Sequence, residues 1–412
     1  MVVGSASRGT WVRGDRDLDL FLLFPPDLDR ESLERDGLAI ARAVALEFGD
    51  GYREKYAEHP YINATVDGLD VDLVPCYCVA AATGIQSAVD RTPFHTRYVA
   101  DRIAGLVDDV LLLKQFTKAG GVYGSDQMTE GFAGYLCELL ILRYGTFEGV
   151  LEAASHWRPG TVIDLERHAA RRFEEPLVVV DPVDPNRNVS ASVSLSQMMA
   201  FVELARGYLE APSPGLFEVR PDPPIPADAF ADALDRRGTT VYALRFPTPN
   251  LIEDVVVPQL RKSLEGLVSL LERHGFVVNR ADCEMGPEHC LLVFELLVDT
   301  LPAVARHQGP PLWNGENAAR FREKYAAGGG ATCAGPFIEN GRYVVEVPRR
   351  FRTAGALLGS DEILGVSLGK NVRRALGRRE LLRGRDCWSG EFAPFLGAFL
   401  DPASPMVRFR RG

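Results

Sequence analysis

The sequence contains few lysines and cysteines and has no long apolar run. Six of the 46 basic residues are lysine, so arginine carries nearly all of the positive charge. The seven cysteines are scattered, and only Cys76 and Cys78 lie close together, with no second pair to complete a zinc set. No run approaches the roughly 20 apolar residues of a membrane-spanning helix. These absences argue against a zinc module and a transmembrane helix, and they predict buried thiols in a reducing cytosol.

The charge is distributed unevenly along the chain. The formal net charge of −10 over 412 residues argues weakly against a polyanionic partner. Residues 342–412 hold 14 Lys or Arg and 7 Asp or Glu, a local charge of +7, which leaves −17 on residues 1–341. A basic C-terminal region is compatible with nucleic acid contacting one face. Charge alone favours the other interpretation, a solvated arginine-rich surface.

The first hundred residues alternate short apolar strands with a helical pattern. A strand is predicted at 18–24, a helix at 29–48 and a strand hairpin at 61–77. The Asp67-Gly68 pair within the hairpin is a strong signal for a tight turn. This alternation predicts a mixed sheet with helices.

Beyond residue 102 the spacing of apolar residues changes from strand-like to mainly helical. Apolar residues at helical spacing predict helices at 103–121, 134–157 and 194–211. A proline-rich stretch at 211–226 is the predicted linker. The remainder predicts an α+β region, with a helix at 256–275, strands at 291–298 and 342–350, and a flexible loop at 326–335.

Three aspartates on two predicted strands indicate a metal site. Side chains alternate faces along a strand, so Asp17 and Asp19 point the same way, as do Asp70 and Asp72. If the strands are neighbours, Asp17, Asp19 and Asp72 converge and raise one another's pKa unless a cation neutralises them. Mg²⁺ binds oxygen ligands, often one or two carboxylates plus substrate phosphates. A lone Asp-x-Asp is usually a solvated strand edge, so the third acid is what makes the pattern specific.

The residues before these aspartates are suited to holding phosphate. Gly4 lets the backbone approach a phosphate closely, and Ser5 offers a hydroxyl and a backbone N–H. Arg8 can donate two hydrogen bonds to phosphate oxygens. Together with the carboxylates, they predict a two-metal phosphoryl-transfer site, in which one metal activates the attacking hydroxyl and the other holds the leaving pyrophosphate.

Ten motifs in order carry a family resemblance. The first two resemble the nucleotidyltransferase signature of the DNA polymerase β superfamily, and the whole set is similar to the archaeal, class I CCA-adding enzymes (tRNA nucleotidyltransferases). The motifs are GSASRGTW, GDRDLDLFLLF, YAEHPY, DVDLVPCY, SAVDRTPFHTRYV, LLLKQFTKAGGVYG, GFAGYLCELLI, VVVDPVDPNRNVSASVS, RHQGPPLW and GPFIENGRYVVEV. They extend over essentially the whole chain.

The resemblance implies a cytoplasmic enzyme that adds C, C and A to the 3′ end of tRNA without a nucleic acid template, using CTP, ATP and two Mg²⁺ ions. It implies that Asp17, Asp19 and Asp72 hold the metals and that tRNA binds by its acceptor arm and 3′ end. A homodimer is compatible with it. The implied nucleotide contacts are Gly4, Ser5, Arg8, Thr92, His95, Lys114, Tyr123 and Arg187, and the tRNA contacts are Arg306, His307 and Arg349.

The residues by themselves leave other roles open. Lys114 lies in an apolar helical stretch, so it meets either an anion or solvent at the edge of the core. His95 is expected in a loop, where a nucleotide contact and an ordinary loop histidine fit equally well. Tyr123 near two glycines is accessible to a ligand or packs in the core. Arg187 is expected in an Asp/Pro/Asn-rich turn facing solvent, yet an arginine can donate to acceptor atoms of both cytosine and adenine.

The resemblance also implies the architecture, a multi-domain α+β fold. We expect a polymerase-β-like nucleotidyltransferase head at 1–102, a helical, base-recognising neck at 103–212, and a tRNA-binding α+β body at 213–412 with an inserted tail at about 280–340. The family pattern has a helix and most of a strand before the Gly-Ser turn, so we expect that an N-terminal segment is missing here and that the head is less stable. The alternatives are another polymerase-β-type transferase, such as a poly(A) polymerase, or a tRNA-binding protein whose catalysis is impaired.

Overall fold

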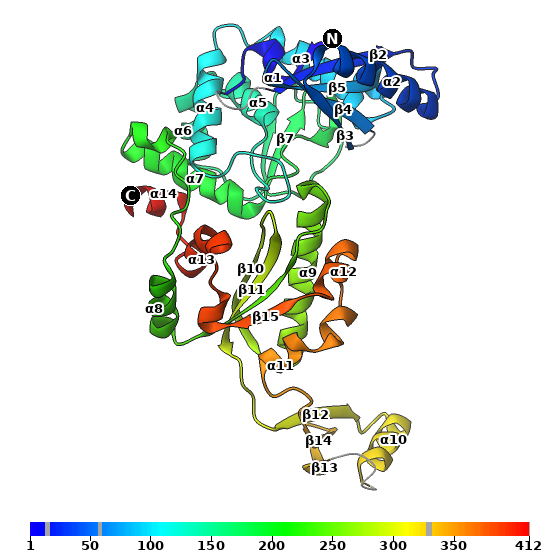
Figure 1. The fold of residues 1–412 in the computed structure, drawn as a ribbon, viewed down its shortest axis with the longest axis vertical. Helices are drawn as coiled ribbons and strands as arrows, with labels where there is room; N and C mark the ends of the chain where they lie inside the picture. Colours follow the sequence, from blue (N-terminus) through cyan, green and yellow to red (C-terminus); the bar gives the residue numbers. More distant parts are fainter. Residues whose placement is uncertain (13–16, 57–59, 327–331, 412) are drawn as a thin grey trace. The chain divides into compact units, whose positions relative to one another are not determined.

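The computed structural model describes residues 1–12, 17–56, 60–326 and 332–411. The chain divides into two compact units: residues 1–221 with 403–412 form the first, and residues 222–402 the second. The division falls inside the predicted linker. No helix in the described part of the chain combines the length and apolar character needed to cross a membrane. Helices and sheets occur in both units, so the predicted α+β class is confirmed (Figure 1).

A five-stranded sheet forms the start of the first unit, in the order β1-β2-β5-β4-β3. Its strands are β1 (Val2–Val3), β2 (Asp17–Phe24), β3 (Gly51–Tyr56), β4 (Pro60–Val66) and β5 (Leu69–Tyr77). The β4–β5 turn has φ values of 50° at Asp67 and 75° at Gly68, as a tight hairpin turn requires. Strands β2 and β5 are parallel, with Asp19 opposite Asp72. The predicted strand, hairpin and strand neighbourhood are therefore confirmed.

Helix α2 (Arg30–Phe48) covers one face of this sheet (Figure 1). It begins where the Asp29 carboxylate accepts a hydrogen bond from the Ser32 backbone N–H at 2.8 Å. Leu18 and Leu20 pack into the core between this helix and the sheet. Because side chains alternate along β2, Asp17 and Asp19 face the other side, where α1 (Gly4–Arg8) contacts β2 and also α3 (Thr92–Ala100).

The next part of the first unit is helical but not wholly so. Its helices are α4 (Val107–Ala119), α5 (Gly134–Tyr144), α6 (Phe147–Ala154) and α7 (Leu195–Glu210). The helix expected at 134–157 is two helices, because Gly145 has a φ of 86° and ends the first of them. Ser194 caps α7 by accepting a hydrogen bond from the Gln197 N–H at 3.3 Å, and the Gln197 side chain donates to the Thr129 carbonyl.

A three-stranded sheet interrupts the expected helical neck. Its strands are β6 (Thr161–Asp164), β7 (Leu177–Asp181) and β8 (Asp184–Asn188), in that order. All five residues of β7 are buried, which is typical of a strand covered on both faces. The region expected as a helical neck thus contains strands as well as helices. This matters for function because the sheet carries Arg187.

The last helix belongs to the first unit, not to the region after the linker. In α14 (Pro405–Arg411), Met406 is buried and joins the helical core. A methyl group at Gly207 of α7 would come within 2.2 Å of the Met406 Cε, so this glycine gives the methionine its place. Ser404 also donates a hydrogen bond to Glu203 at 2.6 Å. Residues 403–412 were expected in the body, but they pack in the first unit.

The second unit contains a body sheet and a smaller tail sheet. The body strands lie in the order β10-β11-β9-β15 and the tail strands in the order β12-β14-β13. The strands are β9 (Thr240–Pro247), β10 (Val277–Met285), β11 (His289–Val298), β12 (Val304–Pro311), β13 (Ala334–Glu339), β14 (Arg342–Pro348) and β15 (Glu380–Arg383). Because β10 and β11 pair within the body, the separate tail sheet spans 304–348 instead of the expected 280–340.

Helices cover both faces of the body sheet, and one helix packs on the tail sheet (Figure 1). They are α8 (Ala227–Arg237), α9 (Glu253–Arg273), α10 (Gly315–Ala326), α11 (Ala354–Gly359), α12 (Lys370–Leu376) and α13 (Ala393–Leu400). The predicted helix at 256–275 and strands at 291–298 and 342–350 are confirmed. Residues 327–331 of the expected loop, like 14–16 and 57–59 of two motifs, lie outside the described residues.

Two of the seven cysteines contradict the prediction of buried thiols. Cys78 and Cys333 are exposed, because Cys78 follows the end of β5 and Cys333 precedes the tail strand β13. The other five are buried.

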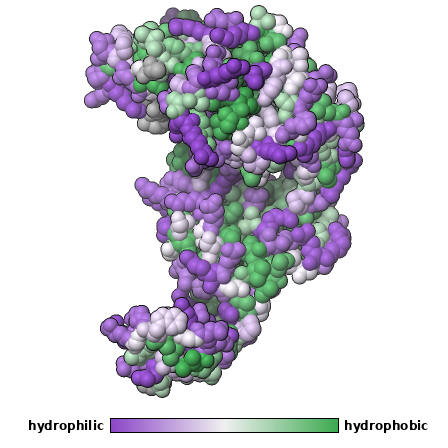
Figure 2. All heavy atoms as spheres, turned by 180° about the vertical axis from the view of Figure 1, so that it is seen from behind, coloured by the Kyte–Doolittle hydropathy of each residue, from purple (hydrophilic) through white to green (hydrophobic). Residues whose placement is uncertain are grey.

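Figure 2 shows one face of the molecule, on which polar and apolar residues alternate.

Candidate active site

The three aspartates lie close enough to influence one another, as predicted. Asp19 is half-buried, and its pKa is raised from 3.8 to about 6 by burial first and then by the negative charges of Asp72 and Asp17. The guanidinium of Arg8 acts in the opposite direction. The raised pKa shows that the folded chain holds these carboxylates together at an energetic cost, which a bound cation would remove.

Gly4 allows the backbone of α1 to approach Asp19. A methyl group at Gly4 would lie 2.0 Å from the Asp19 Oδ2, and its φ of 70° is one that other residues rarely adopt. The expected Gly-Ser turn is the start of a one-turn helix, with Ser5 half-buried beside the carboxylates' strand. Any larger residue at position 4 would therefore displace Asp19.

Asn63 fixes the third aspartate and was not found from the sequence. Its Nδ2 donates to the Asp72 Oδ1 at 2.7 Å, and the two residues are direct partners across β4 and β5. Counting residues outward along both strands from the Asp67-Gly68 turn would have identified Asn63 as the partner of Asp72. Asn63 leaves the other Asp72 oxygen available to a ligand.

The carboxylates fit a hard cation that shares its ligands with a substrate. In the part of the chain that the structure describes, no three His, Cys, Asp or Glu side chains are placed to hold a metal ion by themselves. Asp17, Asp19 and Asp72 offer only oxygen donors, which suits Mg²⁺. Such a site takes its remaining ligands from phosphate and water. That these residues bind a metal ion stays a prediction.

Glu138 contacts two buried cations, and it was not predicted from the sequence as a site residue. Its carboxylate contacts the Arg8 guanidinium at 2.9 Å and the Lys114 ammonium at 3.3 Å, and Lys114 also donates to the Thr10 carbonyl at 2.9 Å. Lys114 is 2% exposed and Glu138 is 0% exposed. The Arg8 Nε finds no hydrogen-bond partner among the described residues. Two cations facing one carboxylate leave an excess positive charge in this cluster, and one of the two, Arg8, also acts on Asp19.

The Glu138 cluster could have been suspected from an acid inside the apolar run of α5.

Next to it, the Tyr123 hydroxyl and the Lys114 Nζ converge on the first residue of α5. A methyl group at Gly134 would lie 3.0 Å from the hydroxyl and 3.3 Å from the ammonium. The preceding residue, Ala133, has no side chain that could cap the helix. The N–H groups at a helix N-terminus, a cation and a hydroxyl together make a site suited to a phosphate group.

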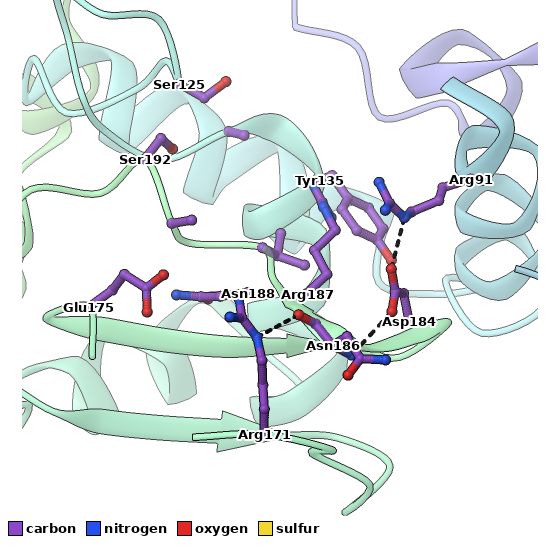
Figure 3. Close-up of a pocket in the computed structure, with 13 residues that line it drawn as sticks. Arg91, Ser125, Tyr135, Arg171, Glu175, Asp184, Asn186, Arg187, Asn188 and Ser192 are labelled. Atoms are coloured by element: carbon purple, nitrogen blue, oxygen red, sulfur yellow. Dashed lines mark hydrogen bonds and ion pairs between the residues drawn. The ribbon is translucent and has the colours of Figure 1, made fainter. Parts of the chain in front are cut away.

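A pocket of about 590 Å³ lies beside strand β8. Figure 3 shows Arg187 and Tyr135 among its lining residues, with the Arg91–Asp184 ion pair, 2.9 Å long, at its edge. Arg171 donates to the Asn186 carbonyl at 2.9 Å on another side. Arg187 lies in a strand, not in the expected turn, because residues 184–188 pair with β7.

His95 lies in helix α3, not in a loop, because that helix begins at Thr92 and Pro93 suits its first turn. Its Nε2 is 2.8 Å from the Asp181 Oδ2, and the Arg187 Nη1 donates to the same oxygen at 2.7 Å. Burial opposes ionisation of Asp181, but the hydrogen bond and charge of His95, with Arg187, hold its pKa below the ordinary value. Asp181 was not found from the sequence, although an acid ending an apolar strand is a signal. Thr92, half-buried, begins α3.

The three predicted tRNA contacts lie in the second unit. Arg306 of β12 is exposed and pairs with Glu339. His307 is exposed and stacks on Phe321, with ring centroids 5.6 Å apart. Arg349 donates to two backbone carbonyls, those of Val304 at 3.2 Å and His274 at 3.1 Å. Their proposed contact with tRNA stays a prediction.

Comparisons with known proteins agree along the whole chain. Three family models match: a nucleotidyltransferase domain at 1–95, a tRNA nucleotidyltransferase second domain at 108–218 and a CCA-adding enzyme C-terminal domain at 237–384. The CCA-adding enzyme of Methanoregula boonei is 59% identical over 100% of this chain and 89% of its own length. That of Methanosarcina barkeri is 45% identical over 91% of this chain and 82% of its own. A solved structure of E. coli MS115-1 CdnC with ATP, 18% identical, covers 53% of this chain and 79% of that chain with a TM-score of 0.37.

Removing the Asp19 charge is expected to stabilise the metal-free protein at neutral pH. The pKa of Asp19 is about 6 in the folded state against an ordinary value of 3.8. Ionising Asp19 therefore destabilises the folded state relative to the unfolded one, and the free energy of unfolding falls as pH rises between these values. Asp19→Asn should raise the melting temperature by roughly 2–4 °C for each kcal/mol regained. Circular dichroism melts in EDTA at pH 7.5 and pH 5 measure this; the rise should appear at pH 7.5 and shrink at pH 5.

The control for that melt is Asp36→Asn, on the helix that covers the opposite face of the sheet. It should not shift the melting temperature at either pH by more than the error. Equal melting temperatures for Asp19→Asn and the unaltered protein at pH 7.5 would contradict the inferred repulsion.

Truncating Glu138 is expected to destabilise the first unit strongly. Glu138→Ala leaves Arg8 and Lys114 buried without their carboxylate, and breaking a buried ion pair costs about 3–5 kcal/mol. Urea unfolding followed by circular dichroism at 222 nm measures the loss. The matched control is Glu152→Ala at an exposed position of α6, for which a change within about 0.5 kcal/mol is expected. A similar small change for Glu138→Ala would mean that the cluster does not stabilise the fold.

Proposed function

This chain belongs to the CCA-adding enzymes, and we propose that Asp17, Asp19 and Asp72 hold two Mg²⁺ ions for its reaction. The enzyme adds C, C and A to the 3′ end of tRNA from CTP and ATP, and its family implies a divalent metal. The single observation that carries the proposed site is the convergence of three carboxylates beside a buried excess of positive charge. That pairing of opposite charges suits a metal–triphosphate complex.

Asp17, Asp19 and Asp72 would hold the Mg²⁺, which would lower the pKa of the 3′-hydroxyl and offset the charge of the leaving pyrophosphate. The chain's own residues position these groups. Asp19 holds one oxygen against the α1 backbone at Gly4, and Asp72 is kept in place by Asn63. Both carboxylates are thus arranged before any substrate arrives, which lowers the cost of ordering the site during reaction.

We propose that the triphosphate lies between α1 and the N-terminus of α5. Arg8 with its unpaired Nε, Lys114 and the Tyr123 hydroxyl provide donors there. Gly4 and Ser5, with the backbone of α1, complete the cradle from the side of the aspartates, and Thr92 contributes from α3. The base is then proposed to enter the pocket beside β8, where Arg187 and His95 contact it.

The proposed division of labour follows the sequence prediction. Residues 1–102 form the catalytic head, and residues 103–212 the neck that recognises the nucleotide. The body is residues 222–402, with the tail binding the tRNA acceptor arm, whereas residues 403–412 pack with the first unit. The matched ranges of the three family models support this division. Arg306, His307 and Arg349 are the proposed tRNA contacts. A homodimer is also proposed, and the tRNA substrate leads us to place the reaction in the cytoplasm.

The transfer reaction tests the proposed site directly. With tRNA lacking its CCA end and one labelled nucleotide at a time, the enzyme should add two C from CTP and should not extend the same tRNA with a run of A from ATP. Asp19→Ala should lower transfer about 10³-fold or more, because metal binding supplies several kcal/mol to the transition state. Asp36→Ala on α2 is the matched control and should keep full activity.

Two results would contradict parts of the proposal. A long run of A with CTP ignored would indicate a poly(A) polymerase. Unchanged transfer by Asp19→Ala would remove the carboxylates from catalysis, and tRNA binding without any transfer by the unaltered protein would leave only a tRNA-binding role.

A further inference from the structure

We propose that Asp181 is a positioning residue that aims the Arg187 guanidinium and thereby sets the discrimination of C and A against U and G. This inference rests on the proposed function, in which Arg187 contacts the incoming base. Asp181 itself is 0% exposed, so it cannot touch a nucleotide. Any influence on base selection must therefore act through the groups that it holds.

The Asp181 carboxylate is held on several sides. Its Oδ2 accepts from Arg187 at 2.7 Å and lies 2.8 Å from the His95 Nε2. Its Oδ1 accepts from the Val183 N–H at 3.1 Å and from the Tyr135 hydroxyl at 3.4 Å. The residue ends the fully buried strand β7, so its backbone is also fixed. A carboxylate tied at both oxygens can serve as a rigid anchor.

Arg187 is anchored at one end and open at the other. One terminal nitrogen donates to Asp181, while the side chain is 36% exposed and lines the pocket beside β8. Figure 3 shows it with Tyr135 in that pocket. Because the guanidinium is planar and rigid, holding one nitrogen sets the direction of the other donors. The exposed donors are then presented to the pocket in one orientation.

A fixed set of donors separates the four bases by their ring nitrogens. Cytosine N3 and adenine N1 are acceptors, whereas uracil N3 and guanine N1 carry hydrogens. Donors held in place bond with the first pair and meet donors on the second pair, which leaves buried polar groups unsatisfied. A guanidinium free to rotate could turn away from uracil and lose this penalty. The anchor, more than the positive charge alone, therefore creates the selectivity.

The same carboxylate oxygen joins the head to this pocket. His95 comes from α3 and stacks on Tyr135 of α5, with ring centroids 4.2 Å apart. Burying an aspartate for stability alone is a poor solution, because a buried ion pair rarely stabilises a fold more than apolar packing would. A buried carboxylate that orients two predicted nucleotide contacts has a role in recognition that packing could not supply.

The test compares Asp181→Asn with the unaltered enzyme in first-nucleotide addition to tRNA lacking its CCA end. The quantity measured is kcat/KM for each of CTP, ATP, UTP and GTP, with CTP and UTP on tRNA lacking all three residues and ATP and GTP on tRNA ending in CC. The CTP-to-UTP ratio should fall about 10- to 100-fold, the range expected for losing a hydrogen bond to a charged group, with a parallel fall in the ATP-to-GTP ratio. Melting curves on the same samples show that the folded fraction is unchanged.

Asp164→Asn is the matched control, since Asp164 ends β6 of the same sheet and, among the described residues, accepts a hydrogen bond only from the Ala169 N–H. Its ratios should equal those of the unaltered enzyme. Arg187→Lys keeps the charge but not the planar donors, so it should lose discrimination as Asp181→Asn does. The double variant should be no worse than Arg187→Lys alone, because both changes remove the same oriented group.

A folded Asp181→Asn enzyme with an unchanged CTP-to-UTP ratio would overturn the proposal, as would additive losses in the double variant. If Asp181→Asn does not fold, Arg187→Lys decides the question, and an unchanged ratio in that variant overturns it. Failure of the unaltered enzyme to transfer CTP would instead refute the proposed function. The two failures are therefore distinguishable.

Discussion

The parallel pairing of β2 with β5 is the constraint on which the active site depends. It places Asp19 directly opposite Asp72 and turns both to the face away from α2. The apolar alternation of β2 stabilises this arrangement, because Leu18 and Leu20 can be buried only if the aspartates face outward. The energy of the hydrophobic core thus maintains carboxylates that repel one another, and a functional site is built at the expense of local stability.

Two buried acids and one partly buried acid of the neck contact described residues of the head. Glu138 binds Arg8, Asp181 contacts His95, and the partly buried Asp184 pairs with Arg91. Two of the head residues involved are predicted nucleotide contacts. The charges that orient a substrate are therefore the same charges that join the two parts of the first unit. A triphosphate would bind at a junction that is already formed, which reduces the ordering needed on binding.

Local patterns predicted the head well. The strand at Asp17–Phe24, the hairpin around Asp67-Gly68 and the neighbourhood of the aspartates all follow from alternation and turn chemistry, which act over a few residues. Prediction failed where contacts distant in sequence decide the conformation. Arg187 lies in a strand only because residues 177–181 offer a partner, and α14 packs within the first unit because Met406 fits against Gly207.

The sequence by itself determined the residue types of the site, the order of its motifs and the family resemblance, because these depend only on chemical identity and spacing. Only the tertiary structure decided which acid meets which cation. Glu138 within an apolar run and Asp181 at the end of one are visible as acids in the sequence, but their partners are decided only by burial against Arg8, Lys114 and Arg187. Electrostatic partnership depends on distance and on exclusion of water, and both arise only when the chain has folded.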